Sequence, residues 1–347
     1  MASATLSALA PLALTMGEPA GIGGEIALKA WIARRNENLP PFFLLDDPAR
    51  LAGLAREMAL DVPIRTIAIP GEAAALFATA LPVLPIPLPA AVSPGRPAAA
   101  NAGSVLAAIE RGVALCLSGE ACGLVTNPIH KETLYGAGFR HPGHTEYLAA
   151  LSGGAQPVML LACPDLRVVP VTVHQGLREA IAGLTSEAIV STATILHDAL
   201  RRDFGCAQPR LAVAGLNPHA GEGGSMGREE IDIITPALDR LRAQGMNVRG
   251  PLSPDTMFHA AARRRYDAAL CMYHDQALIP LKTIGFDCGV NVTLGLPIVR
   301  TSPDHGTAFD IAGRGLANPQ SLIAALHLAA RIAQHRRAGS AGGTAGG

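Results

Sequence analysis

The stretch RLAVAGLNPHAGEGG, residues 210–224, runs from an apolar segment directly into a glycine-rich loop. The segment that follows, EEIDIITPALDRLRAQG (229–245), repeats apolar residues at helical spacing, at positions 231, 234, 238 and 241. Pro236 fits a helix only near its first turn, so we predict that the helix begins close to Ile231 and ends at Gly245. A buried strand, a loop and a helix in this order form the repeating unit of α/β proteins.

The same alternation recurs along the chain. Apolar runs that predict strands stand before helical patterns at PLALTM (11–16), FFLL (42–45), GLVT (123–126) and VVPVTV (168–173). With 347 residues, the chain is long enough for about two domains. The pattern therefore predicts an α/β protein of two domains.

Two segments fall outside this alternation. Residues 81–97 contain six prolines, which predicts an extended surface connection. The tail 337–347 is rich in glycine and alanine and is predicted to be disordered.

Composition excludes several classes of partner. Lys+Arg and Asp+Glu both number 28, and no run of basic residues marks a nucleic-acid-binding surface. The six cysteines are scattered without a C-x-x-C pair, which favours reduced thiols in the cytoplasm. The apolar N-terminus lacks a basic leader region, and no segment reaches about 18 uncharged apolar residues, so we expect neither a targeting signal nor a membrane anchor.

Three histidines each follow an apolar run that predicts a buried strand. They are His174 after VVPVTV, His219 after RLAVAGLNP and His274 after AALCMY. Ligands of open α/β sheets bind at the carboxyl ends of the strands, where such side chains converge. Three imidazoles with a vacant fourth position are typical of a catalytic divalent-metal site. A single histidine at a strand end is more often a hydrogen-bonded loop residue, and the loop at His219 also fits a plain strand-to-helix turn.

Other polar residues near these runs suit a phosphate-sized anion. The glycines after His219 leave backbone N–H groups accessible to an anion. Candidate side chains for binding it are His144, Thr145, Lys282, Asn291 and Arg300. Asp275 and Asp255 are candidates for proton transfer or for orienting a ligand, although carboxylates that cap loops would have the same pattern.

A search for nucleotide motifs gives a negative result. MGEPAGIGGE (16–25) follows a predicted strand and opens a helix, but Ile26 stands where G-x-G-x-x-G requires its third glycine. The chain also lacks G-x-x-x-x-G-K-[ST] and G-x-S-x-G.

Several segments resemble the signatures of one family, the 4-hydroxythreonine-4-phosphate dehydrogenases of pyridoxal phosphate biosynthesis. They are GEPAGIG (17–23), NPIHK (127–131), HPGHTE (141–146), GLNPHAGEGG (215–224), MYHDQALIPLK (272–282) and GVNVTLGLPIVRTSPDHGTAFDIAG (289–313). HGTAFDIAGRGLANP (305–319) is similar to the adenosine-binding segment of isocitrate and isopropylmalate dehydrogenases. One departure is Gly24, where the family usually has proline, which should loosen the start of the first helix.

The resemblance implies an oxidation that depends on NAD or NADP and on one divalent metal ion, Zn, Mg or Co. The substrate would be 4-phosphooxy-L-threonine, which is oxidised and decarboxylated to 3-amino-2-oxopropyl phosphate. His174, His219 and His274 would bind the metal, with His274 supplied by the partner subunit of a homodimer. The five anion-binding candidates named above would bind the substrate, with Lys282 also a catalytic candidate beside Asp275 and Asp255. The cofactor would contact His305, Gly306, Thr307, Ala308, Asp310 and Asn318.

The resemblance also implies the architecture, an isocitrate/isopropylmalate dehydrogenase-like fold with its active site in an interdomain cleft at a dimer interface. Residues 1–128 and 296–336 would form the first domain and 129–295 the second, which would carry the dimer contact.

Three alternatives remain open. Members of the family that the chain resembles also act on D-threonate or D-erythronate 4-phosphate or on carboxylated cis-diols, so the resemblance allows the same fold with one of these substrates. The three histidines would also suit a zinc hydrolase that needs no nucleotide. A catalytically inactive binding protein is the third alternative.

Overall fold

The computed structural model describes residues 9–141, 143–154 and 156–343. It divides into two compact units. Unit 1 consists of Met1–Pro157 and Leu296–Ala338, and unit 2 is formed mainly by Val158–Gly295. The first boundary therefore lies later than residue 128, where the sequence predicts it. The reason is that Leu134, Phe139, Tyr147 and Leu148 belong to the apolar core of unit 1.

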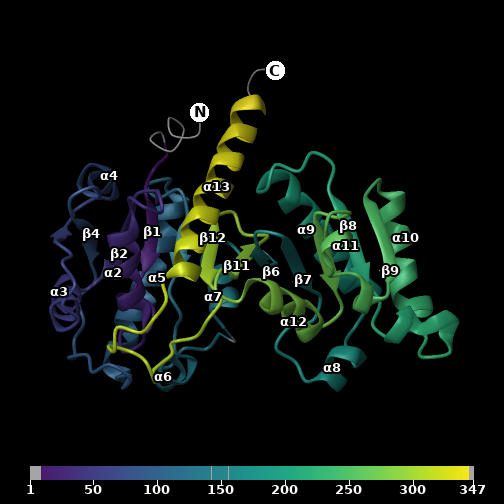
Figure 1. Ribbon diagram of the computed structural model, residues 1–347, viewed down its shortest axis with the longest axis horizontal. Helices are drawn as coiled ribbons and strands as arrows, with labels where there is room; N and C mark the ends of the chain where they lie inside the picture. Colours follow the sequence, from purple (N-terminus) through teal and green to yellow (C-terminus); the bar gives the residue numbers. More distant parts are fainter. Residues whose placement is uncertain (1–8, 142, 155, 344–347) are drawn as a thin grey trace. The chain divides into compact units, whose positions relative to one another are not determined.

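Unit 1 contains a parallel sheet with the strand order β3-β4-β2-β1-β5-β12. The strands are β1 Leu12–Thr15, β2 Phe42–Asp46, β3 Ile64–Thr66, β4 Leu81–Pro85, β5 Leu124–Thr126 and β12 Arg300–Pro303 (Figure 1). β1 and β2 are completely buried, as continuous apolar runs in parallel sheets usually are.

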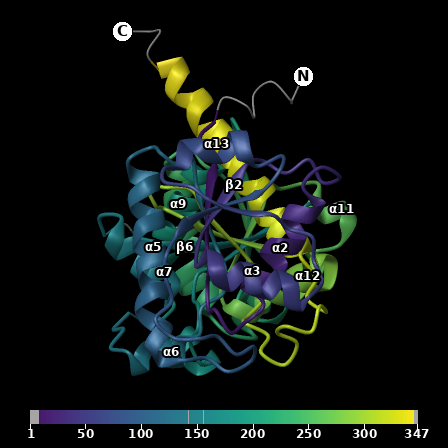
Figure 2. The same cartoon turned by 90° about the vertical axis from the view of Figure 1, so that its left-hand side faces the viewer.

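Helices cover both faces of this sheet. They are α2 Gly23–Ala33, α3 Pro48–Glu57, α4 Ala73–Leu76, α5 Ala102–Leu117, α6 Lys131–Gly136, α7 His144–Leu151 and α13, which begins at Gln320. Figure 2 shows α5 on one side of β2 and α2 on the other. Ala13, Phe43 and Leu45 share a core with Val105 and Ile109 of α5.

One described helix, Ala99–Leu117, is long and apolar enough to cross a membrane by length and composition. Its apolar side lies in the core of unit 1, and its Glu110 accepts a hydrogen bond from the Tyr147 hydroxyl. The core of a folded protein therefore accounts for this apolar composition.

The prediction of a surface connection for residues 81–97 is wrong for its first five residues. Leu81–Pro85 form β4, and Leu81 and Val83 are fully buried between β3 and β2. Leu81 donates to the Pro63 carbonyl and Val83 accepts from Ile67 N–H, so these bonds need no N–H from Pro82. Proline is tolerated in a strand where its missing donor is not required.

Unit 2 contains a mixed sheet with the order β11-β6-β7-β10-β8-β9. The strands are β6 Val158–Cys163, β7 Leu166–Pro170, β8 Arg210–Ala214, β9 Asn247–Leu252, β10 Ala268–Cys271 and β11 Val290–Leu294. β7, β10, β8 and β9 run parallel, whereas β6 is antiparallel to both β7 and β11. The carboxyl ends of β7, β10 and β8 therefore lie at one edge of the sheet.

The helices of unit 2 are α8 Leu177–Ala182, α9 Ser186–Arg202, α10 Thr235–Ala243, α11 Ala260–Arg263 and α12 His274–Gly285. The helix predicted to begin near Ile231 starts with a π-helical turn, Glu230–Ile234, which continues into α10 with Pro236 in its first turn. Ile234, Leu238 and Leu241 are buried, as their spacing predicts, whereas Ile231, the first residue of the pattern, is exposed.

The end of the chain differs from the predicted disordered tail. α13 spans Gln320–Gly343 and so continues beyond residue 336, since no proline interrupts its hydrogen bonding. Residues 344–347 of the predicted tail lie outside the described residues.

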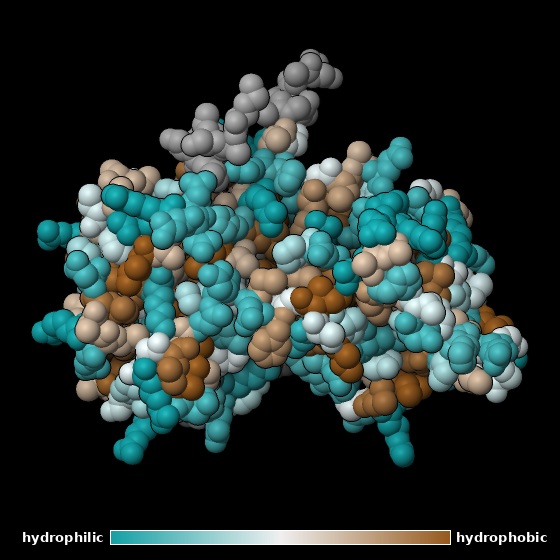
Figure 3. Space-filling model, in the orientation of Figure 1, coloured by the Kyte–Doolittle hydropathy of each residue, from teal (hydrophilic) through white to brown (hydrophobic). Residues whose placement is uncertain are grey.

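Apolar residues form small separated patches among hydrophilic ones on the face drawn in Figure 3. The most exposed large apolar side chains include three in unit 2, Ile279 in α12 (64%), Phe286 directly after it (75%) and Leu177 in α8 (58%). Most of the surface of these three side chains is exposed, which suits contact with another protein surface.

Candidate functional site

The three histidines follow neighbouring parallel strands, as the sequence predicts. His174 follows β7, His219 follows β8, and His274 opens α12 after β10, which lies between the other two strands. The ring centroids of His174 and His274 lie 5.8 Å apart. Both residues line a cavity of about 230 Å³ together with Thr172, Tyr273 and other residues of the same strand ends.

The backbone of these loops adopts left-handed values that favour glycine. Among the described residues seven non-glycine residues have positive φ, and four of them are His174, His219, Ala220 and Glu222. Such conformations cost about 1–3 kcal/mol each and persist where surrounding contacts hold them, often at functional sites. The concentration of such residues in the loops that carry His174 and His219 is therefore typical of a functional site.

Side-chain hydrogen bonds connect the three strand ends. Gln276, which is buried, accepts a hydrogen bond from Met272 N–H (2.7 Å) and donates one to the Gly215 carbonyl (2.8 Å). Thr172 donates to the Met272 carbonyl (2.8 Å). These bonds tie the end of β10 to the ends of β8 and β7, so they fix the spacing of the histidine-bearing loops. Gln276 is not among the residues predicted from the sequence, and only its place in MYHDQALIPLK could have indicated it.

Glu230 organises the loop that carries His219. Its Oε1 accepts hydrogen bonds from Leu216 N–H (2.7 Å) and Asn217 N–H (2.8 Å), and only 3% of the residue is exposed. A Cβ at Gly221 would lie 2.6 Å from Glu230 Oε2, so the glycine allows the loop to wrap closely around this carboxylate. The loop is therefore folded around a buried acceptor rather than held by its own backbone alone.

Glu230 Oε2 also accepts a hydrogen bond from Asn217 Nδ2 at 2.9 Å. We expect Glu230→Gln to destabilise the protein by about 1–3 kcal/mol, because the amide nitrogen at one of the two oxygen positions cannot accept and leaves a buried donor unsatisfied. If the His219 loop holds a metal ion, bound metal should decrease as well, since the loop loses its support. Chemical unfolding and metal analysis after dialysis measure the two effects. Glu229→Gln is the matched control, because Glu229 contacts only the Asn217 side chain among the hydrogen bonds shown for this loop. Equal effects of the two substitutions would contradict a special role for Glu230.

The two aspartate candidates differ in their surroundings. Asp275 accepts at 2.7 Å from Nδ1 of His274, which leaves the other ring nitrogen of that histidine for a ligand. Asp255 lies in the exposed turn Pro254–Thr256, where the Ser253 hydroxyl donates to it. Asp275 therefore orients the ring of His274, a candidate metal ligand, whereas Asp255 caps its own turn.

The described residues do not bring three candidate metal ligands together. In the part of the chain that the structure describes, no group of three His, Cys, Asp or Glu side chains lies close enough to hold a metal ion. His174 and His274 provide two neighbouring imidazoles, a donor type that suits Zn and Co. Imidazole side chains of this kind fit the donor set of a divalent metal site.

Unit 1 holds a second set of candidates around His144 and Arg300. His144 opens α7, and Arg300 opens β12, where its Nη2 donates to the Thr126 hydroxyl at 2.7 Å. Burial lowers the pKa of Arg300 to about 10. Burial also lowers the pKa of His144 well below its usual range, with further contributions from the positive charges of Arg300 and Lys131. His144 Nε2 is buried and has no hydrogen-bond partner.

These groups form an electropositive, desolvated environment that suits an anion such as a phosphate or carboxylate. A neutral imidazole N–H and a guanidinium can both donate to such oxygens, and charge-assisted bonds of this kind are strong. Lys131, in the NPIHK segment, belongs to this group by its charge but was not predicted. Thr145 follows His144 in α7 and is half-buried.

The other two substrate candidates lie in unit 2. Asn291 is in β11, and its Oδ1 is buried without a hydrogen-bond partner. Lys282 is in the last turn of α12, with its ammonium 5.9 Å from the ring centre of Phe286.

The candidate cofactor residues form the segment between β12 and α13 in unit 1. His305 Nδ1 contacts the Gly306 carbonyl at 3.0 Å, and its Nε2 is buried without a partner. Ala308 has a positive φ of 45°. Asn318 Oδ1 accepts from Gln320 N–H at the start of α13, and Asp310 is exposed. The unpartnered imidazole nitrogen and the free carboxylate fit a polar ligand such as a dinucleotide.

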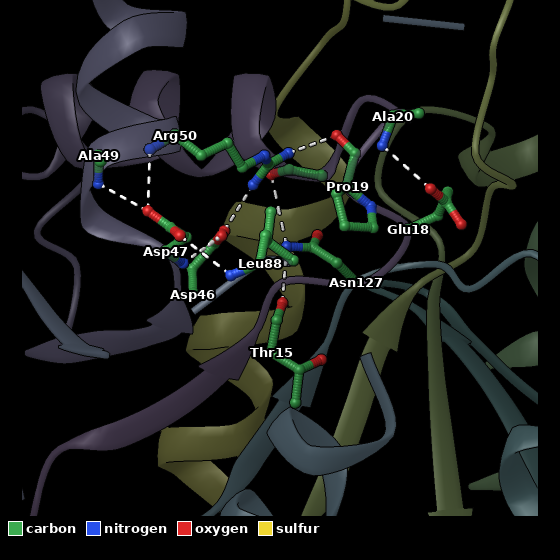
Figure 4. Close-up of polar contacts among 11 residues, drawn as sticks. Thr15, Glu18, Pro19, Ala20, Asp46, Asp47, Ala49, Arg50, Leu88 and Asn127 are labelled. Atoms are coloured by element: carbon green, nitrogen blue, oxygen red, sulfur yellow. Dashed lines mark hydrogen bonds and ion pairs between the residues drawn. The ribbon is translucent and has the colours of Figure 1, made fainter. Parts of the chain in front are cut away.

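A buried ion pair supports the loop 17–22, which precedes α2. Arg50 Nη1 contacts Asp46 Oδ2 at 2.7 Å and Nη2 donates to the Pro19 carbonyl at 2.6 Å (Figure 4). A Cβ at Gly24 would lie 2.9 Å from Arg50 Nη2, so the guanidinium occupies the space that a side chain there would need. Gly24 therefore makes room for Arg50, a role that the sequence pattern does not predict. A cavity of about 320 Å³ lies beside Arg50 and Glu25.

The fold and these sets of side chains define a class, an α/β enzyme that acts on a small anionic substrate. The model of one family, the pyridoxal phosphate biosynthetic protein PdxA, matches residues 39–329. This chain belongs to that family.

Named relatives of this chain support the same family. The chain is 58% identical over 334 residues to a 4-hydroxythreonine-4-phosphate dehydrogenase of Bradyrhizobium diazoefficiens, covering 93% of this chain and 97% of the relative. It is 39% identical to the crystal structure of the enzyme of that name from Klebsiella pneumoniae, with a TM-score of 0.84 over 93% of this chain and 99% of that one. The family and the α/β fold predicted from the sequence are confirmed.

A more distant structure is also similar. A terephthalate 1,2-cis-dihydrodiol dehydrogenase from Burkholderia xenovorans is 30% identical, with a TM-score of 0.63 over 93% of this chain and 98% of that one.

Proposed function

We propose that the protein is a dehydrogenase of pyridoxal phosphate biosynthesis that oxidises 4-phosphooxy-L-threonine. The secondary alcohol transfers a hydride to NAD⁺ or NADP⁺ and releases a proton, and loss of CO₂ then gives 3-amino-2-oxopropyl phosphate. The observation that carries the proposal is the 58% identity over nearly the whole chain to a relative named for this reaction. The buried electropositive group around His144 and Arg300 supports an anionic substrate.

The substrate-binding residues have distinct tasks in this proposal. Arg300 and Lys282 pair with negatively charged oxygens, and His144 donates from Nε2, its buried nitrogen without a protein partner. Thr145 and Asn291 contribute neutral hydrogen bonds that orient the substrate. His305 Nε2, Asp310 and Asn318, with the backbone of Gly306, Thr307 and Ala308, bind the dinucleotide.

His174, His219 and His274 are proposed to hold one divalent metal ion, Zn, Mg or Co. When bound, the metal acts as a Lewis acid that polarises the substrate oxygen. Asp275 fixes the His274 ring through Nδ1, and Gln276 and Glu230 hold the backbone that carries the ligands.

We propose a homodimer in which His274 binds the metal of the partner subunit. Two observations support it: one chain offers no group of three ligands among its described residues, and α12 both begins at His274 and exposes Ile279. An interface along α12 would cover Ile279 and Phe286 and bring His274 to a second subunit. The balanced charge and the six free cysteines support a cytoplasmic protein without nucleic-acid or membrane partners.

Removal of the metal is expected to abolish NADH production from 4-phosphooxy-L-threonine. The protein is dialysed against a chelator, and the rate is measured before and after adding back Zn, Mg or Co. Recovery with a divalent ion supports the ligand assignment. Full NAD reduction by a verified metal-free sample would show that the three histidines have another task, and metal-dependent ester hydrolysis without NADH would favour a hydrolase.

A second candidate substrate is a carboxylated cis-diol, which the likeness to the terephthalate dihydrodiol dehydrogenase favours. A carboxylate and a phosphate both suit Arg300 and His144, so the site alone permits either anion. D-threonate and D-erythronate 4-phosphate are further alternatives, since they share the phosphate and differ in the amino group.

A further inference from the structure

Lys29 of helix α2 binds the backbone of the segment 305–318, which contains the candidate cofactor residues. Lys29 Nζ donates to the Gly315 carbonyl (2.8 Å) and the Ala317 carbonyl (2.7 Å), and it contacts Glu25 Oε1 at 2.9 Å. An ammonium group has three donors, and these three oxygens use all of them. The Lys29 side chain is 21% exposed, so the charge is partly shielded from water.

Glu25 completes this attachment. It is 1% exposed, and its Oε1 also accepts from Ala317 N–H at 2.9 Å. Ala317 is therefore held through both its N–H and its carbonyl. At the other end of the segment, Ile22 N–H donates to the Thr307 carbonyl at 3.1 Å.

Two glycines lower the intrinsic stiffness of this segment near the Lys29 contacts. Gly313 and Gly315 both have φ of 72°, a conformation that glycine adopts without strain but that also leaves it many alternatives. Without Lys29, the carbonyls of Gly315 and Ala317 lose a charged donor. We expect the backbone before Asn318 to sample other conformations as a result.

We propose that Lys29 is a positioning residue for the dinucleotide: it fixes the shape of residues 313–318, and so the place of Asn318, without touching the cofactor itself. The inference rests on the proposed function, because it assumes that residues 305–318 bind NAD(H). It concerns a residue outside all the segments that resemble family signatures. A dinucleotide that meets a preformed segment avoids the entropic cost of ordering it.

The test is a fluorescence titration of NADH against wild-type protein, Lys29→Met and Lys29→Arg without substrate. Lys29→Met is expected to raise the Kd for NADH about tenfold, a loss comparable to one charge-assisted hydrogen bond. Lys29→Arg, whose guanidinium can still donate to two carbonyls, should recover most of the affinity. The KM for the phosphorylated substrate should stay within twofold. Arg35→Met, which removes an exposed positive charge just after α2, is the matched control.

Three outcomes are distinguishable. A Kd for NADH that is unchanged in Lys29→Met, with or without a lower unfolding midpoint, overturns the role of Lys29 and leaves the proposed function intact. An equal rise in the Kd for NADH of Arg35→Met shows a general effect of charge, and this result also overturns the role of Lys29. Wild-type protein that neither binds NADH nor reduces NAD contradicts the proposed function itself. If Lys29→Met does not fold, the same comparison is made with Lys29→Gln, which retains a neutral donor and should bind NADH less tightly than Lys29→Arg.

Discussion

A mixture of His174→Ala and His274→Ala subunits, each inactive alone, is expected to regain about a quarter of the wild-type activity after subunit exchange. If His174 and His219 of one subunit share a metal with His274 of its partner, a hybrid dimer has one site with both substitutions and one intact site. Random exchange makes about half of the dimers hybrids. Each variant alone should lose its metal and nearly all its activity, because every site then lacks one of three ligands.

The control is a mixture of His174→Ala and His219→Ala subunits. In a shared site, His174 and His219 would both come from the same subunit. Each site of a hybrid dimer therefore lacks one of these two ligands, and no activity should return. Recovery in this control, or none in the His174/His274 mixture, would contradict a shared site. The second result would favour ligation within one chain, which the 5.8 Å separation of the His174 and His274 rings would make feasible.

Arg50→Met is expected to lower the free energy of unfolding by about 3–5 kcal/mol, the usual cost of leaving one partner of a buried ion pair without the other. Asp46 is fully buried, and the Arg50 side chain is 9% exposed. The substitution also removes the donor to the Pro19 carbonyl. Denaturant unfolding of the variant measures the effect, and Arg56→Met is the control, since Arg56 is an exposed arginine in the same helix.

The decrease in the free energy of unfolding caused by Arg50→Met should depend on pH. Burial raises the pKa of Asp46, and the Arg50 guanidinium and the Asp47 backbone N–H offset part of this rise. A carboxyl with a raised folded pKa favours the folded state below its unfolded pKa and loses that contribution as the pH rises through the folded value. Without Arg50 the folded pKa rises further, so the destabilisation should be larger at about pH 8 than at about pH 5. A pH-independent loss would show that packing, not charge, dominates.

The sequence predicts the position of the histidines well, because strand ends in a parallel sheet follow from local patterns. Apolar runs before His174, His219 and His274 indicate buried strands, and the structure confirms β7, β8 and β10 as parallel neighbours. The candidate cofactor residues, however, do not lie in a common nucleotide-binding motif, since the G-x-G-x-x-G pattern is absent. Only the resemblance of residues 305–319 to a known segment directs attention there.

Contacts between residues distant in sequence were not predictable. Glu230 is separated from Leu216 by fourteen positions, and Lys29 is 286 positions from Gly315. Glutamate, lysine and arginine are usually exposed, so composition alone assigns these residues to the surface. The strand β4 escaped prediction for a related reason, because proline count suggested a loop although Leu81 and Val83 supply the required backbone bonds.

The most direct test of the proposed activity is NADH production with saturating NAD and added divalent metal, comparing four substrates under the same conditions. These are 4-phosphooxy-L-threonine, D-threonate 4-phosphate, D-erythronate 4-phosphate and a terephthalate cis-dihydrodiol. We predict that the amino acid phosphate has the highest kcat/KM by at least about a hundredfold, a difference of about 2.7 kcal/mol in transition-state stabilisation. A higher kcat/KM for any of the other three would contradict the proposed substrate.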